Sequence, residues 1–139
     1  MTEPANHGCQ RFIRVKAETA RLAEIRHFVE QVALEAALGV ERVFDLKVAV
    51  SEACANAIEH TGRDEVPLEV CARLNAHRLT FVVSDTGLFR PPAPPREGAN
   101  YRGLGLPLMV ALMDEVSFVR IPGGGTAVSL SVLLDSASP

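Results

Sequence analysis

Two polar side chains four residues apart, Glu52 and Asn56, are the first candidates for chemistry in this sequence of 139 residues. Four residues of helix exceed one full turn by only about 40°, so both would lie on one stripe of a helix predicted over residues 41–60. A carboxylate can accept the proton of an attacking hydroxyl group. An amide oxygen is a hard, neutral ligand for Mg²⁺, which takes its other ligands from water and phosphates. The same spacing also describes an ordinary polar helix edge, so other motifs must decide.

A second candidate motif follows an apolar run at residues 81–83. This run belongs to a predicted strand that would carry Asp85 at its end, and Gly87 lies two residues further on. The carboxylate could accept a hydrogen bond from an exocyclic amine such as that of adenine, and the glycine lets the backbone approach a ring closely. Thr126, which begins the final predicted strand directly after Gly124-Gly125, could support such a pocket. Ordinary turns are the alternative explanation for both places.

A third motif, Gly103-Leu104-Gly105-Leu106 preceded by Arg102, leads directly into a predicted helix. Glycines let backbone N–H groups curl around an anion, and a helix N-terminus adds positive potential, so a phosphate is the natural ligand. A loop that needs positive φ is the alternative. The motif fits neither a Walker loop nor a dinucleotide fingerprint, because no Gly-Lys-Ser/Thr follows and the preceding segment is not a strand.

Hydrophobic patterning predicts the elements that must position these residues. Strands are expected over residues 11–17, 66–74, 78–84, 115–121 and 126–134, and helices over residues 19–38, 41–60 and 105–114. Gly39 is the expected C-terminal cap of the first helix. The order predicts a two-layer α/β sandwich, with a mixed, mostly antiparallel sheet and helices on one face. A doubly wound parallel sheet would need strict strand–helix alternation, which is absent.

Composition bounds the class of protein. The chain is expected to form one domain over residues 1–139, with its core at about 11–134. Hydrophobic residues make up 47% and the net charge is −3, with basic residues scattered, so no direct nucleic-acid partner is expected. No apolar run is long enough to span a membrane and no signal-peptide pattern is found, so no membrane partner is expected. The odd, widely spaced Cys9, Cys54 and Cys71 predict three reduced thiols in a cytoplasmic protein, with Cys54 in helix packing.

The order of the three motifs resembles that of the ATPase and kinase superfamily of gyrase, the Hsp90 chaperone, histidine kinases and MutL. Its N box corresponds to Glu52-Ala-Cys-Ala-Asn56, its first glycine box to Asp85-Thr-Gly87 and its second to Gly103-Leu-Gly105. Within that superfamily, SEACANAIEH and RGLGLPLMVALMDEVSF look most like the small anti-sigma-factor serine kinases. The resemblance spans residues 11–134.

This resemblance implies ATP and Mg²⁺ as cofactors. It assigns the general base to Glu52, the Mg²⁺ ligand to Asn56, the adenine-reading carboxylate to Asp85, the close-approach glycine to Gly87 and the phosphate-binding backbone to residues 103–106. Members of the family phosphorylate a small anti-anti-sigma protein with a STAS domain and sequester a sigma factor when that partner is phosphorylated. They usually form homodimers. Thr126 would lie near the adenine.

The sequence departs from the family pattern in its first glycine box and in the lid that follows. Phe89 stands where the pattern has a second glycine, and the lid, expected at about 88–102, is short and rich in proline. Of its arginines, Arg102 is the candidate for the γ-phosphate; a solvated loop arginine is the alternative. Two other functions stay open: a nucleotide-gated binding module without productive phosphotransfer, and a degenerate pocket that binds no nucleotide.

Overall fold

A computed structural model of the protein describes residues 9–61, 67–85, 105–120 and 126–134. The elements in chain order are β1 (Arg11–Lys16), a 3-10 turn η2 (Thr19–Arg21), α1 (Leu22–Glu35), α2 (Val40–Thr61), β2 (Pro67–Leu74), β3 (Arg78–Asp85), α3 (Gly105–Leu112), β4 (Glu115–Arg120) and β5 (Thr126–Leu133). Every predicted helix and strand is present, within a few residues of its expected bounds. Within the described ranges, no helix combines the length and the apolar character needed to cross a membrane.

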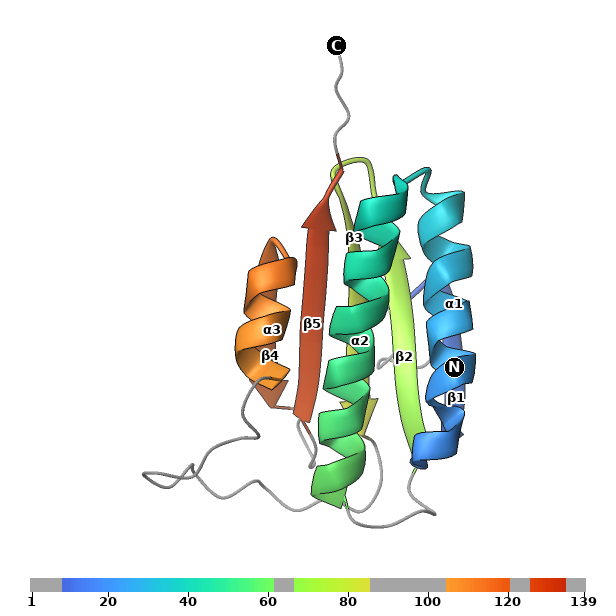
Figure 1. Ribbon diagram of the computed structural model, residues 1–139, viewed down its shortest axis with the longest axis vertical. Helices are drawn as coiled ribbons and strands as arrows, with labels where there is room; N and C mark the ends of the chain where they lie inside the picture. The colour runs from blue at the N-terminus through green and yellow to red at the C-terminus, as the bar shows by residue number, and fades with distance from the viewer. Residues whose placement is uncertain (1–8, 62–66, 86–104, 121–125, 135–139) are drawn as a thin grey trace.

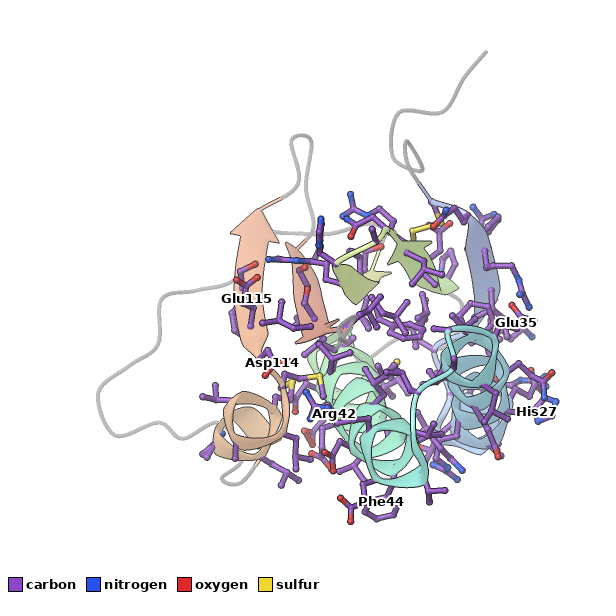
Figure 2. The ribbon with its side chains drawn as sticks, turned by 90° about the horizontal axis from the view of Figure 1, so that it is seen from above. His27, Glu35, Arg42, Phe44, Asp114 and Glu115 are labelled. Atoms are coloured by element: carbon purple, nitrogen blue, oxygen red, sulfur yellow. A yellow bond between two sulfur atoms is a disulfide. The ribbon has the colours of Figure 1, made fainter. Side chains whose placement is uncertain are left out.

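The strands form one sheet in the order β1-β2-β3-β5-β4. Helices α1, α2 and α3 lie side by side over one face, with α2 in the middle (Figures 1 and 2). The predicted two-layer α/β sandwich is therefore confirmed. Each strand pair in the described sheet is antiparallel, so the sheet is wholly antiparallel there rather than mixed.

The core lies between the sheet and the helical layer, and α2 is its centre. The apolar stripe of α2 is buried at Val43, Leu46, Val50 and Ala53. On β5, Leu130 and Val132 are fully buried, and Val128 and Leu134 pack against the core, so these alternate residues form the inward face of the strand. The rings of Phe28 on α1 and Phe81 on β3 meet edge to face, with centroids 6.3 Å apart. This packing sets which stripe of α2 faces outward.

The end of α1 differs from the prediction that Gly39 caps it. The helix ends at Glu35, and the left-handed residue is Ala37, with φ 62°. The N–H of Ala37 donates to Leu34 O at 2.9 Å and that of Leu38 to Ala33 O at 3.2 Å. These are the two bonds of a Schellman motif, which satisfies the last carbonyls of the helix. Leu38 packs against the core, and that contact compensates for an alanine in a conformation that favours glycine.

The cysteines also differ from the prediction of three reduced thiols. Cys9 and Cys71 form a disulfide, with Cα atoms 5.7 Å apart. The β1–β2 pairing brings them together, because Phe12 lies opposite Cys71 and Gln10 N donates to Ala72 O. Cys54 is the packing residue expected: it is fully buried on α2, and burial raises the pKa of its thiol to about 12.

Candidate functional site

Helix α2 places Glu52 and Asn56 on one side of its buried stripe, and both side chains are half-buried. Their side of the helix faces α3, because Arg42, which lies within about 80° of them around the axis, hydrogen-bonds to the carbonyl of Leu112 at the end of α3. Both candidates therefore stand along the α3-facing margin of α2, where they are supported by the core and still reached by solvent.

The strand ends bring two more predicted residues to one place. Ser84 of β3 pairs with Ala127 of β5, so the next positions along these antiparallel strands are Asp85 and Thr126. The C-terminal end of α2, the end of β3, and the starts of α3 and β5 all lie at the lower end of the molecule in Figure 1. Elements that are separate in the sequence thus converge at the end of α2 that carries Asn56.

The remaining predicted site residues are placed only in part. Gly105 and Leu106 form the first positions of α3, where the resemblance puts the phosphate-binding backbone. Gly87, Arg102, Gly103, Leu104 and the lid expected at 88–102, with Phe89, lie outside the described residues.

A groove of about 430 Å³ lies over the solvent side of α2, with Arg26 of α1 at one edge. Its lining residues are Arg26, Phe44, Lys47, Val48, Ser51 and Glu52. Within the described part of the chain, the buried Ser51 Oγ has no hydrogen-bond partner. Phe44 points outward from α2 (Figure 2). Glu52 therefore borders this groove. Sequence reasoning missed the groove because helical periodicity does not reveal which helices are neighbours.

The described residues offer no cage for a metal ion made of protein ligands alone. Within these ranges, no group of three or more His, Cys, Asp or Glu side chains is close enough to hold one. Mg²⁺ does not require such a cage, since it commonly takes one or two protein ligands and completes its shell with water and phosphate oxygens. A half-buried amide such as that of Asn56 fits this demand.

Sequence comparisons identify the family of the chain. Residues 15–132 match the family model of the histidine kinase-like ATPase domain. Serine-protein kinase RsbW of Bacillus velezensis is 34% identical over 118 residues, which cover 75% of this chain and 74% of the relative. RsbW of Bacillus licheniformis is 34% identical over 125 residues, covering 80% and 77%.

Two solved structures share the fold. The structure of the RsbU and RsbW domains of a Mycobacterium tuberculosis protein gives a TM-score of 0.65 at 21% identity, covering 89% of this chain and 33% of that one. The SiaB–SiaC complex of Pseudomonas aeruginosa gives 0.61 at 14% identity, covering 94% and 93%. At these identities the structures establish the fold alone.

The two-layer sandwich and the matched domain define the class: this chain belongs to the histidine kinase-like ATPase family, whose domain binds a nucleotide. Within that class it belongs to the RsbW family of serine-protein kinases, as the identity and coverage of the Bacillus relatives show. The resemblance to the small anti-sigma-factor serine kinases is thus confirmed, and the protein is by family a protein serine/threonine kinase.

Proposed function

We propose that the protein uses ATP and Mg²⁺ to phosphorylate a serine of a small STAS-domain anti-anti-sigma partner, and that it sequesters a sigma factor when the partner is phosphorylated. The observation that carries the proposal is the placement of Glu52 and Asn56 on the α3-facing margin of α2, half-buried. The RsbW relatives are named serine-protein kinases, and one structural neighbour comes from a two-protein complex, SiaB–SiaC.

In this proposal each residue has one role in phosphoryl transfer. Glu52 accepts the proton of the serine hydroxyl group. The serine oxygen bonds to the γ-phosphorus as ADP leaves. Asn56 holds Mg²⁺, and Asp85, with Thr126 beside it, reads the adenine. The acceptor serine approaches Glu52 from the groove on the solvent side of α2.

The loop and lid complete the pocket. Gly87 lets the backbone approach the adenine ring, and the backbone N–H groups of residues 103–106 bind the phosphates at the start of α3. Arg102 meets the γ-phosphate. The protein acts in the cytoplasm as a homodimer, which sedimentation would report as about twice the chain mass of 15.0 kDa.

The test is phosphate transfer from ATP to a STAS protein encoded beside this gene, in the presence of Mg²⁺. Glu52→Gln should lower the transfer rate by a factor of about 100 or more and leave ATP binding in place, because only proton acceptance is lost. Glu41→Gln is the matched control: it makes the same change at an exposed position in the first turn of the same helix. Asn56→Ala should weaken ATP binding only when Mg²⁺ is present.

Each alternative outcome has a distinct signature. Wild-type transfer by Glu52→Gln would show that Glu52 is not the base. ATP binding without transfer to any STAS protein would favour the nucleotide-gated binding module. The observation that suggests this alternative is Phe89 in the first glycine box. A melting temperature unchanged by saturating Mg-ATP would refute both, because a ligand that binds the folded state must stabilise it.

A further inference from the structure

One arginine joins the two helices that hold the proposed nucleotide site. Arg42, in the first turn of α2, donates from Nη1 to Leu112 O at 3.2 Å and from Nη2 to Asp114 Oδ2 at 2.8 Å. Nη1 also donates to Asp45 Oδ2 at 3.1 Å. Figure 2 shows Arg42 and Asp114 close together between α2 and α3. A single guanidinium thus binds three acceptors at once.

The acceptor Asp114 is itself fixed to the sheet. Its Oδ2 accepts a hydrogen bond from Leu133 N at 2.7 Å, and its own N–H donates to Ser131 O at 2.9 Å, both on β5. The Arg42 side chain is about one-third exposed, so solvent only partly screens the ion pair. The end of α3 is therefore connected to both α2 and β5 through one half-buried cluster.

Helix α3 packs on the core through Met109, and Arg42 adds a positive charge that its own C-terminal end lacks. The helix is eight residues long and has no basic residue in its last turn to complement its C-terminal carbonyls. Arg42 supplies that positive charge from the neighbouring helix. Because the start of α2 meets the end of α3, the two helices run in opposite directions, and Gly105 at the start of α3 lies toward the Asn56 end of α2.

From this arrangement we infer that Arg42 is a positioning residue for nucleotide binding, an inference that rests on the proposed function. It sets the axis of α3 against α2, so that the phosphate-binding backbone at Gly105 stays aligned with Asn56. An eight-residue helix is about 12 Å long, so a tilt of about 10° at its clamped end moves the other end by about 2 Å. A displacement of that size breaks backbone hydrogen bonds to a phosphate.

The test compares the affinity of Arg42→Met and wild type for a fluorescent ATP analogue, mant-ATP, with Mg²⁺. The variant should bind about tenfold more weakly, the effect on affinity of losing one hydrogen bond to a charged phosphate. Arg42→Lys should recover part of the affinity, because lysine keeps the charge and lacks the planar fork. Arg78→Met is the matched control: it breaks the surface ion pair with Glu115, and Arg78 lies on the sheet face opposite the helices, since its neighbour Leu79 points into the core.

A second variant and a second readout separate positioning from loss of stability. Asp114→Asn keeps an acceptor for Leu133 N and removes the charge that Arg42 binds, so it should weaken mant-ATP binding in the same direction. Without nucleotide, amide exchange of residues 105–112 should be faster in Arg42→Met and unchanged in Arg78→Met. Equal affinities, or equal losses in Arg42→Met and Arg78→Met, would overturn the inference. A wild-type protein that binds no mant-ATP would instead refute the proposed function, and this inference with it.

Discussion

Replacing Cys9 with serine removes the covalent link between the start of β1 and the middle of β2, two strands that are far apart in the sequence. The bond spans 62 residues. By the chain-entropy relation, closing a loop of that size in the unfolded state stabilises the folded protein by about 4 kcal/mol. With an unfolding entropy of roughly 0.29 kcal/mol/K for a chain of this length, that free energy corresponds to a fall of about 14 °C in melting temperature.

Calorimetry of the oxidised protein, with and without dithiothreitol, measures this effect. Reduction should lower the melting temperature of the wild type by the same amount as Cys9→Ser does, and should not change that of the variant further. Cys71→Ser and the double variant should melt together with Cys9→Ser, because any one of these changes opens the same loop.

Two results would refute this reasoning. If reduction left the wild-type melting temperature unchanged, the bond would contribute nothing through the unfolded state. If the double variant lost about twice as much as either single one, side-chain packing rather than loop closure would carry the stability.

Ala37→Gly should raise the free energy of unfolding by about 1 kcal/mol, since Ala37 has φ 62°, and Ala36→Gly at φ −85° should lower it in the same urea titration. Cys54 should not react with Ellman's reagent at pH 8 until the protein unfolds. Burial raises the pKa of its thiol from 9.0 to about 12, so above about pH 9 only the unfolded thiol ionises, and the free energy of unfolding should fall as the pH rises. Thr80→Val should cost about 1–3 kcal/mol by leaving the buried Ser131 hydroxyl, 2.8 Å away, without its partner, and Thr80→Val with Ser131→Ala should recover most of it.

Local patterns in the sequence were enough to predict the elements and the family. The apolar stripe of α2 follows from a 3.6-residue period, and the hairpin of β2 and β3 follows from Asn75, whose side chain accepts hydrogen bonds from His77 N at 2.7 Å and Arg78 N at 2.9 Å. Glu52 and Asn56 were found because four residues of helix keep two side chains on one stripe. The prediction for the cap of α1 was wrong because it relied on the local preference for glycine. The contact of Leu38 with the core compensates for an alanine in the left-handed conformation.

The sequence by itself therefore determined the order of helices and strands and the family to which the motifs belong. Tertiary structure alone decided the Cys9–Cys71 disulfide, the binding of Arg42 to Asp114 across 72 positions and the groove beside Glu52. The physical reason is the range of the interactions. Periodicity and capping act within a few residues, whereas these contacts depend on the strand order β1-β2-β3-β5-β4 and on which helices lie side by side above it.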